Sequence, residues 1–156
     1  MPGPNPIMDP LEAQPLRVLY AEDDEVDAEL FRNHVTALNP NVALQVVPDG
    51  ADALAYLRRE DPYVAAPRPD VVVLDLHMPK VSGIEVLAEM KADPLLVAIP
   101  VIVLSVESVE DTIRRLYAMH AAAFVPKPDS VDGYSTIARH MNEFWLRTAL
   151  LPGAFR

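Results

Sequence analysis

The chain has 156 residues, of which 23 are acidic and 13 basic, and its formal net charge is −10. It is long enough for one domain with its own core, and the scattered basic residues of so acidic a chain disfavour direct binding to DNA. It contains no cysteine, which excludes disulfides, thiol nucleophiles and thiolate metal sites and leaves oxygen or imidazole groups as metal ligands.

The first 15 residues differ from the rest of the chain. They contain five of the 16 prolines, so we expect a disordered leader over residues 1–15. This N-terminus has no basic or apolar region of signal length. The longest apolar run, residues 95–106, is too short to span a bilayer and contains Pro100. The sequence therefore predicts a cytoplasmic protein without a membrane span.

Apolar segments of strand length then alternate with segments of helical period. Strands are predicted over 16–21, 43–47, 70–75, 100–105 and 123–127, and helices over 26–38, 50–59, 84–90 and 109–120, with a long last helix after residue 127. This alternation is typical of a parallel sheet covered by helices on both faces. The expected fold is α/β, a (βα)5 doubly wound sheet of five parallel strands in the order 2-1-3-4-5.

Acidic residues follow the first and third strands, which are neighbours in this order. The first strand is followed by Glu22 and Asp23, and the third ends at Asp75. Carboxylates so close together repel unless a cation intervenes, and a set of oxygen ligands suits Mg²⁺. We expect Asp23 and Asp75 to bind Mg²⁺ directly, Glu22 to act through water, and the main-chain carbonyl of His77 to be a third protein ligand.

A carboxylate beside Mg²⁺ can also attack a phosphoryl group. Ser105 ends the fourth strand and Lys127 the fifth, and both can stabilise phosphoryl oxygens. Each residue alone has a structural explanation: Asp23 or Asp24 can cap the following helix, Ser105 can cap the next one, and Lys127 can be a solvated strand end. Their joint occurrence at the ends of four strands favours a chemical role for Asp75.

The segments YAEDD, LDLHMPKVSG, VLS and FVPKP, in this order, resemble the four signatures of the response-regulator receiver domain of two-component signalling. The resemblance covers roughly residues 16–150 and implies the flavodoxin-like receiver fold. It also implies the roles of five residues: the phosphoacceptor Asp75, the acid pair Glu22 and Asp23, the switch hydroxyl of Ser105, and Lys127. The phosphoryl donor would be a sensor histidine kinase.

The resemblance also implies how the signal leaves the site. Phe124 occupies the position of an aromatic switch residue, whose ring turns inward when the hydroxyl of Ser105 moves toward the phosphoryl group. This movement would repack the face formed by the helix over 109–120, the strand over 123–127 and the last helix. Phe124 has an alternative explanation as a fixed core residue. The bond between Lys127 and Pro128 stands where the family frequently has a cis bond.

Two further residues, His77 and Glu107, lie two positions after Asp75 and Ser105, where the family tunes attack by water on the acyl phosphate. A Mg²⁺-dependent phosphatase with an aspartate nucleophile is disfavoured, because it would need an acid in place of His77. We therefore expect a phosphoacceptor signalling protein and not an enzyme in the ordinary sense. Its catalysis would be limited to its own phosphorylation and dephosphorylation.

A narrower resemblance, to the single-domain regulators of phytochrome-type histidine kinases, rests on the loop over 61–69 and on the segment FWLRTALLP near the C-terminus. It implies a bacteriophytochrome as a possible kinase partner. After Lys127 the remaining residues are too few for an output domain, so residues 16–150 are expected to form the receiver domain and 151–156 a tail. The output would then pass through a partner or through self-association.

Apolar residues near the C-terminus suggest a homodimer. Tyr117, on the helix over 109–120, would join this contact, and the apolar residues of the C-terminal end itself are Trp145, Leu146, Leu150, Leu151 and Phe155. They supply more apolar surface than one helical stripe buries, and exposed aromatic patches often mark contact surfaces. The predicted interface combines the output face with this C-terminal end. The alternative function is a phosphorylation-independent adaptor or dimerisation module with the same fold.

Overall fold

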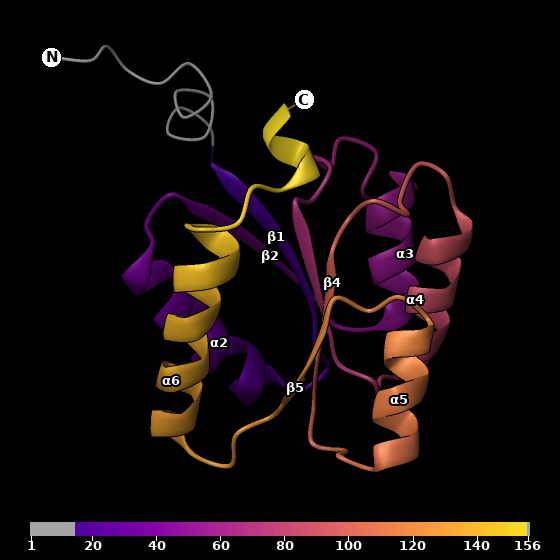
Figure 1. Cartoon of the computed structure of the whole chain (residues 1–156). Helices are drawn as coiled ribbons and strands as arrows, with labels where there is room; N and C mark the ends of the chain where they lie inside the picture. Colours follow the sequence, from indigo (N-terminus) through magenta and orange to yellow (C-terminus); the bar gives the residue numbers. More distant parts are fainter. Residues whose placement is uncertain (1–14, 156) are drawn as a thin grey trace, which may run out of the picture.

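The computed structural model describes residues 15–155, with side chains to residue 153, and alternates five strands with five α-helices (Figure 1). The strands are β1 (Leu16–Ala21), β2 (Val42–Val47), β3 (Val71–Leu74), β4 (Val101–Ser105) and β5 (Ala123–Pro126). The helices are α2 (Glu25–Leu38), α3 (Gly50–Arg58), α4 (Gly83–Ala92), α5 (Glu110–Ala118) and α6 (Val131–Met141), followed by a π-helical turn (Asn142–Leu146) and a 3₁₀ turn (Pro152–Phe155). The predicted leader lies outside the described residues except for Pro15.

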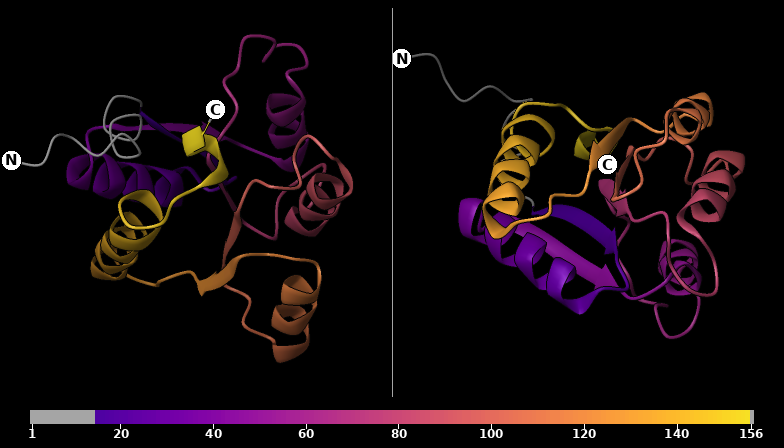
Figure 2. Two further views of the ribbon diagram at one scale, coloured as in Figure 1. Left: turned by 45° about the horizontal axis from the view of Figure 1, so that its top comes forward. Right: turned by 90° about the horizontal axis from the view of Figure 1, so that it is seen from below.

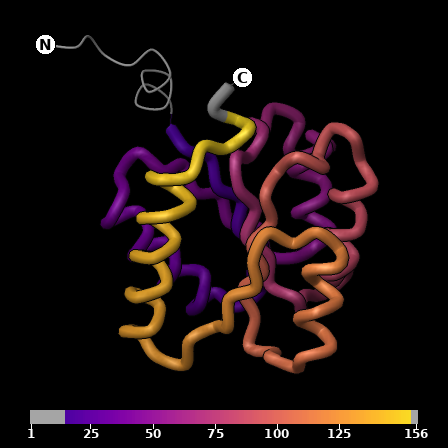
Figure 3. The backbone as a smooth tube through the Cα atoms, in the orientation of Figure 1, coloured from indigo at the N-terminus to yellow at the C-terminus, as the bar shows by residue number. Residues whose placement is uncertain are grey.

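The five strands form one parallel sheet in the order β2-β1-β3-β4-β5, which confirms the predicted fold class and strand order. Helices α2 and α6 cover one face of the sheet, and α3, α4 and α5 cover the other (Figure 2). The start of β1 and the C-terminal 3₁₀ turn lie at one end of the sheet (Figure 3). The loops that lead from β4 to α5 and from β5 to α6 lie at the opposite end.

Two apolar clusters hold the helices against the sheet. The side chains of β3 alternate between them, since Val72 and Leu74 pack with α3, α4 and α5, whereas Val71 and Val73 pack with α2 and α6. All four residues of β3 are buried, because both faces of the sheet are covered. The strand therefore delivers Asp75 from the centre of the core to the edge of the sheet.

Where the ends of these strands and of the first four helices differ from the predicted ones, they differ by one or two residues. Strand β3 ends at Leu74 and β5 at Pro126, so Asp75 and Lys127 lie just beyond their strands. Helix α4 starts at Gly83 because Ser82 and Glu85 form a capping box. Within residues 15–155, no helix is both long and apolar enough to cross a membrane.

The last predicted helix is shorter than expected and continues as the π-helical turn. Leu146 in this turn and Leu151 after it are buried in the cluster beneath α2 and α6, and Trp145 packs against the same cluster. Phe144 and Leu150 are more than half exposed. The apolar residues of the C-terminal end are thus divided between the core and the surface. Because Leu151 is in the core, the packed part of the chain extends past residue 150.

Candidate phosphoacceptor site

The acids after β1 and β3 meet at one edge of the sheet, as predicted. Carboxylate oxygens of Glu22, Asp23 and Asp75 all lie within 4.8 Å of one another. Strands β1 and β3 are hydrogen-bonded neighbours, and the N–H of Asp75 donates to the carbonyl oxygen of Ala21 at 3.1 Å. The chains leaving the two strands then diverge to opposite faces of the sheet, which opens the site between them.

Glu22 is buried, and both of its carboxylate oxygens already accept hydrogen bonds. Oε1 accepts from the N–H of Asp24 at 3.1 Å, and Oε2 accepts from the hydroxyl of Tyr20 at 3.0 Å and from the Lys127 ammonium at 2.8 Å. Burial raises the pKa of Glu22 above its ordinary value, against the lowering effect of the bond from Lys127. This arrangement suits a carboxylate that acts through water better than one that binds a metal directly.

Asp23 and Asp24 have different roles in the structure. Asp24 is the N-cap of α2, and its side chain accepts from the N–H groups of Val26 and Asp27 at 2.9 and 3.0 Å. Asp23 is exposed and makes no hydrogen bond or ion pair with any residue that the structure describes. The capping role therefore belongs to Asp24, and the oxygens of Asp23 are available to a cation.

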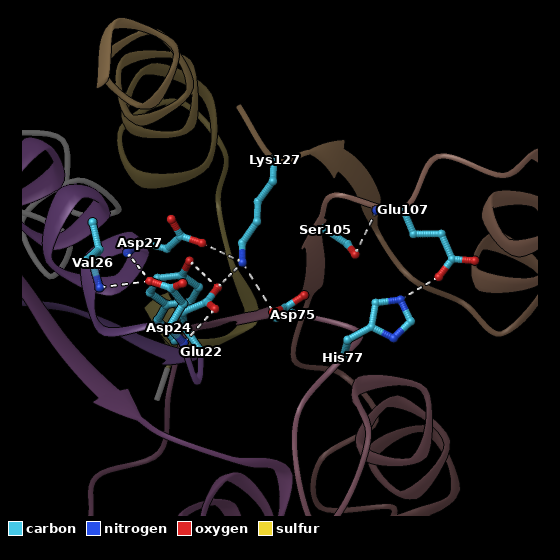
Figure 4. A network of polar contacts seen from close by, with 10 residues as sticks. Glu22, Asp24, Val26, Asp27, Asp75, His77, Ser105, Glu107 and Lys127 are labelled. Atoms are coloured by element: carbon cyan, nitrogen blue, oxygen red, sulfur yellow. Dashed lines mark hydrogen bonds and ion pairs between the residues drawn. The ribbon is translucent and has the colours of Figure 1, made fainter. Parts of the chain in front are cut away.

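Lys127 joins the acids into one network (Figure 4). Its ammonium lies 2.8 Å from Glu22 Oε2, 2.9 Å from Asp27 Oδ2 and 3.3 Å from Asp75 Oδ2, and its side chain is 6% exposed. Burial by itself lowers the pKa of Lys127, but the bonds to Glu22 and Asp27 and the charge of Asp75 raise it overall. Lys127 is thus held as a cation and is not a solvated strand end.

Asp27 is a member of this network that the sequence analysis missed. It lies in the first turn of α2, four residues after the predicted ligand Asp23. The available signal was the run EDDEVD, in which Asp27 follows the N-cap by three residues. One turn of helix brings such a residue back toward the end of the strand.

Ser105, at the end of β4, is fully buried. Its hydroxyl oxygen accepts from the N–H of Glu107 at 3.3 Å, and its carbonyl oxygen accepts from the N–H of Lys127 at 2.8 Å. The alternative that Ser105 caps the next helix is wrong, because α5 begins after Val109 and has no side-chain cap.

The expected cis bond between Lys127 and Pro128 is also wrong. Among the described residues, the cis peptide bond is the one between Asp61 and Pro62. The trans form is intrinsically the more stable one for a residue followed by proline.

His77 and Glu107 connect the loops after β3 and β4. His77 Nε2 lies 2.7 Å from one oxygen of Glu107, and the hydroxyl of Thr112 donates to the other at 2.9 Å. These hydrogen bonds, first from Thr112 and then from His77, lower the pKa of Glu107. In Figure 4 this contact lies on the side of Asp75 and Ser105 that faces away from Lys127.

Phe124 lies on β5 and is half-buried against the cluster beneath α3, α4 and α5. Its N–H donates to the hydroxyl of Tyr117 on α5 at 3.1 Å. Tyr117 is about half exposed, so this bond joins the edge strand to a helix at the surface. The switch role of Phe124 remains a prediction.

The sheet order and the site define a known class of protein. The family described as the response regulator receiver domain matches residues 18–137, and the chain belongs to this family. Response regulator Rcp1 of Synechocystis sp. is 34% identical over 140 residues, which are 90% of this chain and 95% of Rcp1. The probable methanogenesis regulatory protein FilR2 of Methanothrix harundinacea is 35% identical over 146 residues, 93% of this chain and 94% of FilR2.

Solved structures agree with this assignment. The phosphorylated cyanobacterial phytochrome response regulator RcpA is 39% identical, with a TM-score of 0.85 over 88% of this chain and 99% of RcpA. The Mn²⁺-bound form of Rcp1 is 33% identical, with a TM-score of 0.84 over 88% and 99% of the two chains. The predicted receiver fold and the resemblance to phytochrome response regulators are confirmed, and the chain is a protein of phosphorylation-based signalling.

Proposed function

We propose that the protein accepts a phosphoryl group on Asp75 from a sensor histidine kinase. The observation that carries this proposal is the position of Asp75 beside Lys127 and Asp23, at the end of a fully buried strand. An isolated strand terminus would be solvated and would need no buried lysine. Ser105, at the end of the neighbouring strand, supplies a hydroxyl at the same edge of the sheet.

In the proposed step, a carboxylate oxygen of Asp75 attacks the phosphorus of the phosphohistidine. The O–P bond forms as the P–N bond breaks, and the imidazole nitrogen keeps the electron pair and takes a proton from solvent. The Lys127 ammonium and the Ser105 hydroxyl stabilise the charge on the phosphoryl oxygens. The same site would accept a phosphoryl group from a small acyl phosphate and lose it slowly to water, without turning over another substrate.

We assign Mg²⁺ as the cofactor of this site. Asp23 and Asp75 offer carboxylate oxygens, the main-chain carbonyl of His77 would add a third ligand, and Glu22 would act through water. An oxygen-only ligand set favours a hard divalent cation, and the Rcp1 structure bound to Mn²⁺ supports a divalent ion in this family. When bound, such an ion would supply positive charge for the phosphoryl oxygens.

The proposed partner is a kinase of the phytochrome type, such as a bacteriophytochrome, since the similar structures include phytochrome and bacteriophytochrome response regulators. The proposed output is a rearrangement in which Ser105 and Phe124 change the face formed by α5, β5 and α6. We further propose that this face and the C-terminal end form a homodimer. Exposed Tyr117, Phe144 and Leu150 support an apolar contact there.

The test is mass spectrometry after incubation with acetyl phosphate and Mg²⁺. We expect one phosphoryl adduct on the wild-type chain and none on Asp75→Asn. Asp111→Asn, at an exposed acid in the first turn of α5, is the matched control and should keep the adduct. An adduct that persists in Asp75→Asn, or its absence from the wild type, would contradict the proposal. Phosphotransfer from labelled phytochrome-type and unrelated kinases would then test the partner.

A further inference from the structure

The ion pair between Lys127 and Asp27 has no part in the reaction described above. Asp27 Oδ2 lies 2.9 Å from Lys127 Nζ, closer than Asp75 Oδ2 at 3.3 Å. The position of Asp27 is set by the start of α2, since its own N–H donates to the capping side chain of Asp24. The helix start thus places a fourth carboxylate beside the three that were expected.

Lys127 has no hydrogen left for a phosphoryl oxygen in this arrangement. A lysine ammonium has three N–H donors, and Glu22, Asp27 and Asp75 are three acceptors within 3.3 Å. The two shorter contacts are with Glu22, directly after β1, and Asp27 on α2, and both lie on one side of the phosphoacceptor Asp75. The ammonium therefore lies closer to Glu22 and Asp27 than to Asp75, although it contacts all three (Figure 4).

The two shorter contacts differ in how readily they can be given up. The side chain of Glu22 is fully buried and that of Asp27 is 27% exposed. If the lysine moved, water could solvate the carboxylate of Asp27 but not that of Glu22, and leaving a buried charge without a partner is costly. Asp27 is thus the partner that can release the lysine.

We propose that Asp27 is a positioning residue that holds Lys127 toward α2 in the resting protein, so that the lysine engages a phosphoryl group on Asp75 only by loosening this ion pair. The role rests on the proposed function of Asp75. Asp27 would oppose phosphorylation in two ways, because it competes for the lysine and adds a negative charge near an incoming anion. Its removal should therefore favour the phosphorylated state.

The experiment compares Asp27→Asn with Glu25→Gln at saturating Mg²⁺. Both variants remove one negative charge from the first turn of α2, but Glu25 makes no contact with Lys127 in the described structure. The rate constant for phosphorylation by acetyl phosphate should rise roughly fivefold to tenfold in Asp27→Asn, which is the effect of weakening one charge-assisted hydrogen bond. In Glu25→Gln it should change by less than about twofold, because exposed charges interact weakly.

Two more measurements separate positioning from a merely structural role. The affinity for beryllofluoride, a phosphoryl mimic, followed by ¹⁹F resonance, should increase in Asp27→Asn by a similar factor. Asp27→Glu, which keeps the charge, should restore the wild-type value. Equal rates in Asp27→Asn and Glu25→Gln, or a slower Asp27→Asn, would overturn the role of Asp27 while wild-type phosphorylation stayed normal. If the wild type itself formed no phosphoryl adduct, that result would instead contradict the function proposed for Asp75.

Discussion

Gly83, the first residue of α4, lies directly against the main chain of Asp75. A Cβ atom at Gly83 would be 2.1 Å from the carbonyl oxygen of Asp75 and 2.9 Å from its carbonyl carbon. The N–H of Gly83 also donates to the carbonyl oxygen of Leu76 at 2.9 Å. The loop that follows the phosphoacceptor is therefore closed by a glycine that leaves no room for a side chain.

Gly83→Ala should destabilise the fold and impair the site together. The methyl group would meet backbone and not a flexible side chain, so we expect a loss of about 2–3 kcal/mol in the free energy of unfolding. Urea unfolding measures this change. Ser82→Ala is the control, since losing the N-cap should cost about 1 kcal/mol but leave Asp75 in place and phosphorylation intact. Equal stability and activity in the two variants would contradict this contact.

Removing the charge of Asp23 should stabilise the metal-free protein and abolish its response to Mg²⁺. Its carboxylate lies within 4.8 Å of two others, and relieving that repulsion is worth roughly 0.5–1 kcal/mol at an exposed position. Mg²⁺ at ten times its Kd should stabilise the wild type by about 1.4 kcal/mol. Chemical unfolding of the wild type and of Asp23→Asn, each with and without Mg²⁺, measures the gain in stability and the loss of the response to Mg²⁺.

Asp24→Asn provides the control for Asp23, because asparagine is an equally good N-cap and the neighbouring charge is removed without touching the site. This variant should keep the full response to Mg²⁺. If Asp23→Asn also kept that response, Asp23 would not be a ligand.

Glu107→Gln should loosen the loop between β4 and α5. The change weakens the contact with His77 that joins this loop to the one after β3. Because the pair lies near the surface, the melting temperature should change little. Amide hydrogen exchange over residues 105–109 should become faster. Glu89→Gln, which removes an exposed ion pair with Arg58 at 2.6 Å, should leave exchange there unchanged. Unaltered exchange in Glu107→Gln would show that the contact does not hold the loop.

The proposed homodimer can be tested without cutting into the core. Deleting the C-terminal end would remove the buried Leu146 and Leu151 and destabilise the core. A substitution at the exposed Leu150 tests the interface more specifically. Leu150→Glu should convert the dimer to a monomer in light scattering, because an unpaired charge in an apolar contact is unfavourable. Leu95→Glu, at a still more exposed leucine of the loop before β4, should leave the dimer intact. A monomeric wild type, or a dimeric Leu150→Glu, would refute the interface.

The chemical core of the site was predictable because it depends on topology. A continuous apolar run of strand length places Asp75 at a strand end, and the order 2-1-3-4-5 brings that end beside Glu22 and Asp23. The identity of the helix cap was not predictable, since Asp23 and Asp24 are chemically equivalent in the sequence. The local backbone decided it by directing the side chain of Asp24 toward two N–H groups of α2.

The sequence by itself determined the alternation of strands and helices, the position of each strand to within two residues, and the family to which the chain is similar. These features depend on residues close together in the chain, whose periodicity and spacing are visible in the letters. Only the tertiary structure decided which carboxylates share Lys127. It also decided that Glu22 accepts hydrogen bonds from Tyr20 and Asp24, and that Gly83 lies against Asp75. Such contacts depend on distances of a few ångströms that the packing of the folded chain sets, and those of Lys127 join segments far apart in the sequence.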